Sequence, residues 1–124
     1  MKLSGEGTLL RIFLGESDRF GHHALYDVIV RRAREAGMAG ATVTRGVEGF
    51  GAGSRVIHTA KILQLSEDLP MVIEIVDTEE KIAAFIPVVD ELFEQVGCGG
   101  MMTQERVTVV KYTQGKSAPP PSRS

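Results

Sequence analysis

Residues 40–55 read GATVTRGVEGFGAGSR. The stretch begins with the alternating pattern of a β-strand, which we expect over 41–47, and then becomes rich in glycine. Glycine adopts positive φ values and lets the backbone approach a ligand closely, at an entropic cost to folding. Arg45 and Arg55 flank the loop with planar guanidinium groups that suit phosphate or carboxylate. The stretch therefore predicts either a loop that binds an anion or a long hairpin connection with solvated charges.

The composition is that of one ordinary globular domain. The 124 residues are 43% hydrophobic and 24% charged, and the net charge of −2 argues against a general nucleic-acid binder. A single cysteine, Cys98, forms no disulfide framework and favours a reducing compartment. With neither a signal sequence nor a long apolar run, we expect a cytoplasmic protein with an ordered domain over 1–113. The tail over 114–124 is rich in Pro and Ser and predicts disorder.

Apolar periodicity predicts a regular order of elements. We expect strands over 7–15, 41–47, 71–76 and 105–112, with a further extended piece over 56–65. A helix is expected over 20–36 with Asp18 as its cap, and a second over 79–96 after Thr78, where Pro87 should kink or divide it. The order strand–helix–strand–strand–helix–strand predicts an α+β, ferredoxin-like split βαβ fold (βαββαβ). In that fold an antiparallel sheet carries both helices on one face.

The strands predict self-association, because they look apolar on both faces. In the first strand Leu9, Ile12 and Phe13 are apolar, and 71–76 is similar apart from Glu74. A sheet covered by helices on one face would leave the other apolar face open, so we expect copies of the chain to bury it. Glu74 predicts a salt bridge, with Arg11 or Lys111 as its partner.

The histidines and the hydroxyl groups give weak signals for chemistry. His22 and His23 adjoin on the expected helix and point about 100° apart, so they do not easily share one metal. Ser54 and His58 lie in the loop without a supporting shell, which is a poor setting for a catalytic triad. We therefore predict no catalytic residue, no metal site and no cofactor. The second glycine cluster, VGCGGMMT over 96–103, predicts a helix C-cap and turn. It is a weaker signal for anion binding than a phosphate loop, because no Lys follows the glycines.

The order of elements, together with GATVTRGVEGFG at the end of the second strand, resembles the PII family of signalling proteins. The motif spans residues 40–51 with one extra residue after Thr44, and the order of elements covers about 6–112. The phrases EGFGA and SEDLPMVIEIVD resemble still more a PII-like group, the domain of unknown function 190 family.

This resemblance implies a homotrimer that binds a small anionic ligand, with an adenine nucleotide as one candidate, between subunits. It also implies a mobile glycine-rich loop that docks onto a protein partner such as a transporter or an enzyme. Thr42 matches the position beside the adenine. The positions near the phosphates are matched by Gly49, Phe50 and Gly51, and by the turn that contains Gly99 and Gly100. The family's lysine in that turn is missing, and Arg45 and Arg55 are candidates to supply its charge.

Two other readings of the sequence remain. Ferredoxin-like oligomers also form small enzymes with sites at subunit interfaces, although this chain has no convergent acid–base set. A metal-binding trimer of similar fold would have to use His22, His23 and His58.

Overall fold

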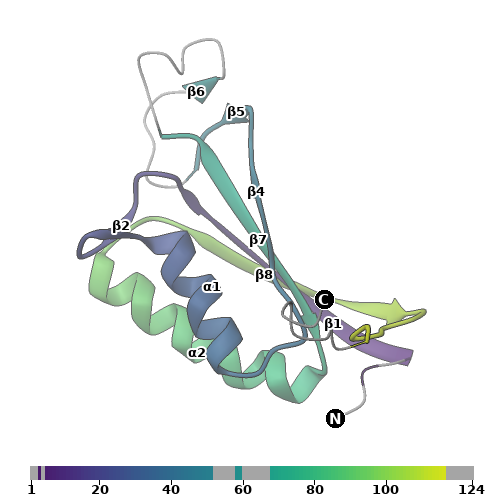
Figure 1. The fold of residues 1–124 in the computed structure, drawn as a ribbon. Helices are drawn as coiled ribbons and strands as arrows, with labels where there is room; N and C mark the ends of the chain where they lie inside the picture. Colours follow the sequence, from purple (N-terminus) through teal and green to yellow (C-terminus); the bar gives the residue numbers. More distant parts are fainter. Residues whose placement is uncertain (1–2, 4, 52–57, 60–67, 117–124) are drawn as a thin grey trace, which may run out of the picture.

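The longest strand, β1 (Gly5–Gly15), is an inner strand of a four-stranded antiparallel sheet. The structure is a computed structural model that describes residues 3, 5–51, 58–59 and 68–116. In the sheet β1 lies between β7 (Pro70–Asp77) and β8 (Met101–Val109), and β4 (Thr42–Arg45) forms the edge beyond β7 (Figure 1). The middle of the sheet therefore pairs residues from the beginning of the chain with residues from its second half.

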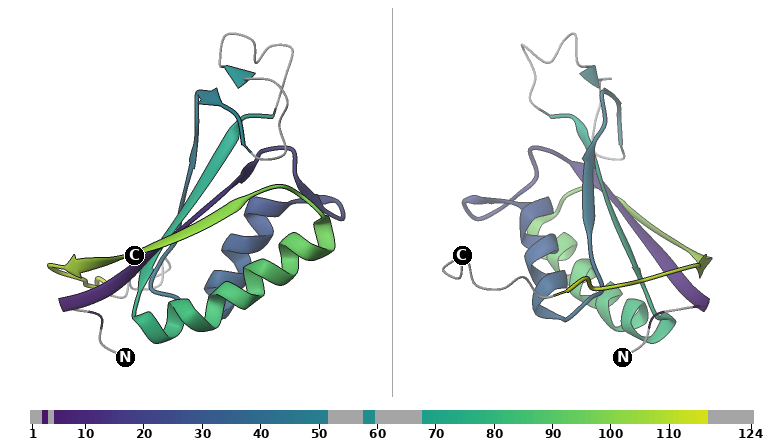
Figure 2. Two further views of the ribbon diagram at one scale, coloured as in Figure 1. Left: turned by 180° about the vertical axis from the view of Figure 1, so that it is seen from behind. Right: turned by 45° about the vertical axis from the view of Figure 1, so that its right-hand side comes forward.

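Two helices, α1 (Leu25–Glu35) and α2 (Glu79–Val96), cover one face of this sheet (Figures 1 and 2). The hydroxyl of Thr78 accepts a hydrogen bond from the Lys81 amide at 3.3 Å, which caps α2 as its sequence predicts. Gly97 ends the helix with a left-handed φ of 72°. Pro87 lies inside α2 and does not divide it. The α+β, ferredoxin-like fold predicted from the pattern is confirmed.

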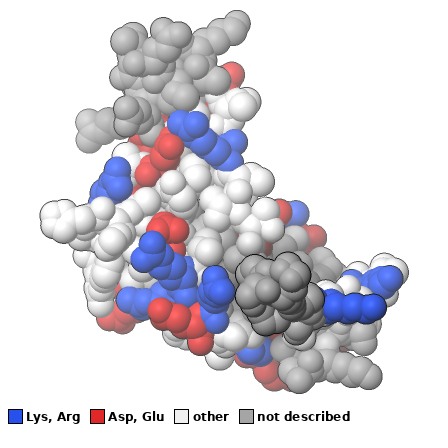
Figure 3. All heavy atoms as spheres, viewed as in Figure 1, with Lys and Arg blue, Asp and Glu red and all other residues white. Residues whose placement is uncertain are grey.

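The hydrophobic core lies between the sheet and the helices. The residues at alternate positions of β1 and β7 point into it, because neighbouring side chains on a strand face opposite sides. Ile12 and Ile73 are fully buried there, and Ile29 and Val89 meet them from the helices. On the outer surface of the helices acidic and basic side chains are interspersed (Figure 3), as in the 3.1 Å ion pair between Arg31 and Asp27.

The open face of the sheet mixes apolar and polar side chains. The register places Val72 beside Phe13 and Val76 beside Leu9, and these are the apolar residues that the sequence predicts there. Further side chains on this face are Arg11 and Glu74 on the inner strands, Thr42 and Thr44 on β4, and Met101, Thr103, Glu105 and Val107 on β8. The predicted apolar residues of the inner strands therefore lie on the open face, with charged groups between them.

The predicted helix over 20–36 begins too early. Its first part forms a short hairpin between β2 (Arg19–Phe20) and β3 (His23–Ala24). Gly21 in the turn has a φ of +64°, which a helix does not use. Asp18 does not cap the helix, because its Oδ2 accepts a hydrogen bond from the Gly15 amide at 2.8 Å. The two adjacent histidines therefore belong to the hairpin.

The glycine-rich stretch leaves the sheet after β4. A pair of two-residue strands, β5 (Glu48–Gly49) and β6 (His58–Thr59), lies beyond the end of the sheet in Figure 1. The expected extended piece over 56–65 includes β6, and its other residues lie outside the described ones. Among the described residues, no helix combines the length and the apolar character needed to cross a bilayer.

The last strand is displaced from its predicted position. The sequence pattern predicts a strand over 105–112, whereas β8 runs from Met101 to Val109. The next three residues, 110–112, then turn away and cross the ends of the strands toward the start of β4 (Figure 2, right). We call residues 110–112 the C-terminal strap. Residues 114–116 are exposed and carry no regular secondary structure, and the remainder of the expected tail lies outside the described residues.

Candidate functional site

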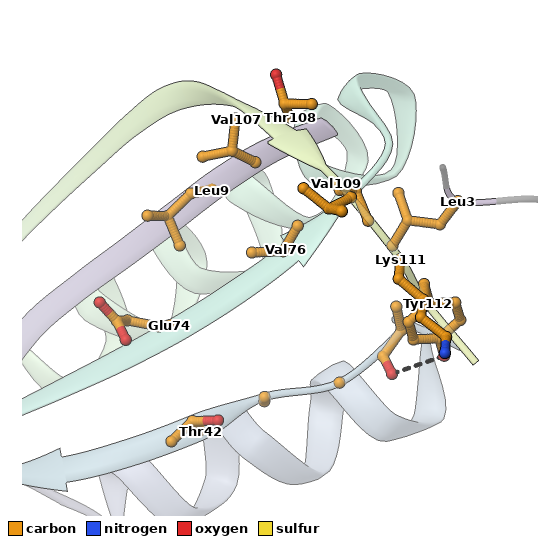
Figure 4. A pocket seen from close by; sticks show the side chains of 14 residues that line it. Leu3, Leu9, Thr42, Glu74, Val76, Val107, Thr108, Val109, Lys111 and Tyr112 are labelled. Carbon is orange, nitrogen blue, oxygen red and sulfur yellow. Dashed lines mark hydrogen bonds between the residues drawn. The ribbon is translucent and has the colours of Figure 1, made fainter. Parts of the chain in front are cut away.

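One cavity lies where the open face meets the C-terminal strap, and we call it the strand-end pocket. Its volume is about 690 Å³. Thr42 and Glu74 stand at one end of it and Tyr112 at the other (Figure 4). Its remaining lining residues are mostly apolar or small: Leu3, Leu9, Ala39, Gly40, Ala41, Val76, Val107, Thr108, Val109, Val110 and Lys111. The shape and the lining suit a small molecule with an apolar, planar part.

Glu74 is held in place by an ion pair at the centre of the open face. Arg11 donates from Nε to Glu74 Oε2 at 2.8 Å and from Nη1 to Glu105 Oε1 at 3.0 Å. These two partners, with the Glu74 hydrogen bond the largest cause, raise the pKa of Arg11. The predicted Arg11–Glu74 salt bridge is therefore present, whereas Lys111 lines the pocket without bonding to Glu74. The second carboxylate oxygen of Glu74 makes no hydrogen bond within the described chain.

A second cavity, which we call the glycine pocket, lies at the opposite end of the same strands. It has a volume of about 400 Å³. Phe50 and Gly51 enter it from the glycine-rich stretch, and Gly99 and Gly100 enter it from the turn after α2. Four of the residues predicted to bind a ligand thus lie around one cavity, although 48 positions separate Gly51 from Gly99. The turn also serves as the predicted C-cap, since Gly97 N donates to Phe93 O at 2.8 Å.

Acidic groups line the glycine pocket. Asp18 and Asp68 both contribute to its wall, and the described lining residues include no Lys, Arg or His. Desolvation, followed by the charge of Asp68, raises the pKa of Asp18. Desolvation, followed by the charge of Asp18, also raises the pKa of the Cys98 thiol, which therefore stays protonated at neutral pH. An anion in this cavity needs positive charge from outside its described lining.

The remaining predicted ligand-binding residues are dispersed. Thr42 lies in the strand-end pocket, and Gly49 pairs with His58 without lining the glycine pocket. Arg45 lines neither cavity, because its guanidinium donates to Glu16 Oε1 at 3.1 and 3.2 Å. Arg55 lies outside the described residues. Among the residues that the structure describes, no group of three His, Cys, Asp or Glu side chains is placed to hold a metal ion.

Sequence reasoning missed several residues of these cavities. The pattern predicts Asp18 as a helix cap, and it predicts Lys111 and Tyr112 as the continuation of a strand. A carboxylate three residues after Gly15 is a signal for a turn rather than a helix, because Asp often accepts a nearby backbone amide. For Tyr112 the sequence carries no such signal.

Comparison with known proteins identifies the family. The model of the DUF190 family, described as "Uncharacterized ACR, COG1993", matches residues 7–109. A UPF0166 protein of Aquifex aeolicus is 38% identical over 102 residues, which are 82% of this chain and 91% of the relative. A UPF0166 protein of Methanocaldococcus jannaschii is 36% identical over 92 residues, which are 74% of this chain and 83% of the relative.

Solved structures show the same fold. CPII, a nitrogen regulatory PII-like protein from Thiomonas intermedia K12 in complex with ADP, AMP and bicarbonate, superposes with a TM-score of 0.64. That alignment covers 86% of this chain and 90% of CPII at 16% identity. A second structure of CPII, bound to ADP and bicarbonate, gives a TM-score of 0.63 over the same shares at the same identity. The predicted resemblance is confirmed: the chain belongs to the DUF190 family and has the PII-like ferredoxin fold.

Proposed function

We propose that this protein is a homotrimeric, PII-like regulator that is not an enzyme. It binds a small anionic ligand, with an adenine nucleotide as the favoured candidate, in the clefts between its subunits. It signals to a protein partner through the glycine-rich loop that follows Arg45.

The position of the two cavities is the observation that carries this proposal. Leu9 lines the strand-end pocket and Phe13 lines the glycine pocket, and both lie on the open face of β1. Four residues along a strand span about 13 Å, so the two cavities sit at opposite ends of one face. Each is open to the outside within a single subunit. Two copies that meet along their open faces can bring the strand-end pocket of one subunit next to the glycine pocket of the other.

The chemistry of the strand-end pocket favours a nucleobase at this end of the cleft. The Thr42 hydroxyl and the second oxygen of Glu74 both lie beside the cavity, and together they offer a donor and acceptors to the edge of a base. The apolar side chains of Leu9 and Val76 suit the faces of the ring. Lys111 supplies a positive charge for an anionic group. The solved structures of CPII, which share the fold, contain ADP and AMP.

Calorimetric titration with ADP, combined with sedimentation analysis, tests this function. We expect a trimer that binds ADP, and we expect Thr42→Val to weaken binding about fivefold through the loss of one hydrogen bond. The matched control is Thr44→Val, since Thr44 lies on the same face of the same strand but lines neither cavity. A monomeric wild-type protein, or the absence of heat with both ADP and AMP, would refute the proposal.

A further inference from the structure

The C-terminal strap forms one wall of the strand-end pocket. Residues 110–112 all line the cavity as they cross from the end of β8 toward the segment before β4 (Figures 2 and 4). Val110 is 91% exposed, whereas Tyr112 is 37% exposed and is thus mostly covered by its neighbours. Tyr112 is therefore the residue of the strap with the closest contact to the rest of the subunit.

One hydrogen bond attaches this wall to the rest of the subunit. The Tyr112 hydroxyl donates to the carbonyl oxygen of Ala39 at 3.1 Å, across 73 residues of sequence. Within the described stretch 110–116, no other residue makes a hydrogen bond or an ion pair outside the β8 ladder. Loss of this hydroxyl would therefore weaken the attachment of the strap to the residues before β4.

The acceptor of this bond is itself fixed. The Ala39 amide donates to Asp77 Oδ2 at 2.8 Å. Asp77 is fully buried, and its Oδ1 accepts a hydrogen bond from the Thr78 amide at the start of α2. Gly37, two residues before Ala39, is also held, because its carbonyl oxygen accepts a hydrogen bond from the Lys81 ammonium at 2.6 Å. Hydrogen bonds to Asp77 and Lys81 thus fix the segment over 37–39 at the start of α2. The hydrogen bond from Tyr112 then attaches the strap to this fixed segment.

We propose that Tyr112 is a positioning residue of the ligand site. It holds the strap closed on the strand-end pocket and keeps its neighbour Lys111 in the cavity wall. This inference rests on the proposed function for the identity of the ligand, but the closure itself is a property of the free protein. Tyr112 acts through Lys111 and the strap.

A double-mutant cycle with ADP as the probe tests this role. We expect Lys111→Met to weaken ADP binding about tenfold and Tyr112→Phe about three- to fivefold, the latter corresponding to one exposed hydrogen bond. The double variant should bind ADP no more weakly than Lys111→Met alone, because both changes remove the same placed charge. The dependence of ADP affinity on KCl should decrease in Tyr112→Phe as it does in Lys111→Met. The control is Tyr26→Phe on α1, which should bind ADP like the wild type.

Hydrogen exchange without ligand provides the second measurement. In Tyr112→Phe, the Ala39 amide, which donates to Asp77, should exchange faster than in the wild type, while the paired amides of β1 should be unchanged. If ADP binds the wild type and Tyr112→Phe equally, or if the two effects of the cycle add, the positioning role is wrong and the proposed function stands. If ADP does not bind the wild type, the proposed function is wrong. The exchange rates alone then show whether Tyr112 holds the strap against the cavity. Unchanged exchange of the Ala39 amide overturns this role.

Discussion

At the scale of single residues, the neighbours of a glycine decide whether it is needed for packing or is available for a ligand. A Cβ on Gly100 would lie 2.7 Å from Phe93 Cε2 and 2.8 Å from the carbonyl oxygen of Phe13. The second neighbour is backbone of an inner strand and does not move easily. A Cβ on Gly51, in the same cavity, would meet nothing within 4 Å. The two glycines of the pocket therefore differ in their structural role.

We expect Gly100→Ala to lower the free energy of unfolding by about 1–3 kcal/mol, the usual cost of overpacking. Gly51→Ala is the matched control and should change stability by less than about 0.5 kcal/mol. Urea denaturation of both variants measures the difference. Equal stabilities would mean that the turn after α2 adapts without cost, which contradicts the tight contact with β1.

At the scale of elements, the hairpin before α1 shows how one residue redirects a segment. Gly21 adopts a φ of +64°, and a Cβ added there would meet nothing within 4 Å, so its role is purely conformational. The Leu25 amide then donates to Asp18 O at 2.8 Å, which closes the hairpin and places the start of the helix at Leu25. The hairpin thus sets which face of α1 meets the sheet.

Gly21→Ala separates the hairpin from the helix that the sequence alone predicts. In the hairpin, alanine must adopt a left-handed conformation, and we expect a loss of about 1 kcal/mol of stability. In the interior of a helix, the same change would add about 1 kcal/mol. The sign of the change in thermal or urea denaturation therefore decides between them. Gly21→Asn should lose less than Gly21→Ala, because asparagine tolerates this conformation better.

The sequence predicts the helices and strands because each has a local periodicity of apolar residues. The partners of charged residues depend instead on how the strands pair, which the sequence does not show. The sequence offers Arg11 and Lys111 as candidate partners of Glu74, because Glu74 is the one charge in the apolar strand predicted over 71–76, and the structure selects Arg11, 63 positions away. Arg45 could not be paired with Glu16, because the loop around it offers several competing roles. Thr42 and the turn that contains Gly99 and Gly100 are candidates for ligand binding only because the sequence resembles the PII family. The alternation of residues 105–112 hides the strap, because only the contact of Tyr112 with Ala39 shows that the chain leaves the sheet.

At the scale of the whole molecule, the open face is the surface that we expect to form the interface of the proposed trimer. Its centre combines the apolar side chains of the inner strands with the ion pairs of Arg11, which are only partly exposed and satisfy each other within one subunit. A surface of this kind is buried at less cost than one with unpaired charges. The helix face, by contrast, carries charges of both signs (Figure 3).

Val72→Asp tests the role of this face in the proposed trimer. Val72 lies beside Phe13 on the open face, and an unpaired carboxylate there would cost several kcal/mol when a neighbouring subunit covers it. We expect sedimentation to give the monomer mass of 13.4 kDa, with the circular dichroism of a folded chain. Ala84→Asp, at an exposed position of α2, is the control and should remain trimeric. A trimer of Val72→Asp would exclude this face from the interface.

The placement of β1 between β7 and β8 also has a consequence for synthesis on the ribosome. This strand emerges before either of its partners, which begin at Pro70 and Met101. Until those later segments have been translated, the amides and carbonyls of β1 lack their native partners, and its apolar side chains lack α2. Nascent chains with such unpaired strands are prone to aggregate. A ribosome-bound chaperone should therefore stay on the segment of β1 for longer than on the later strands of the sheet.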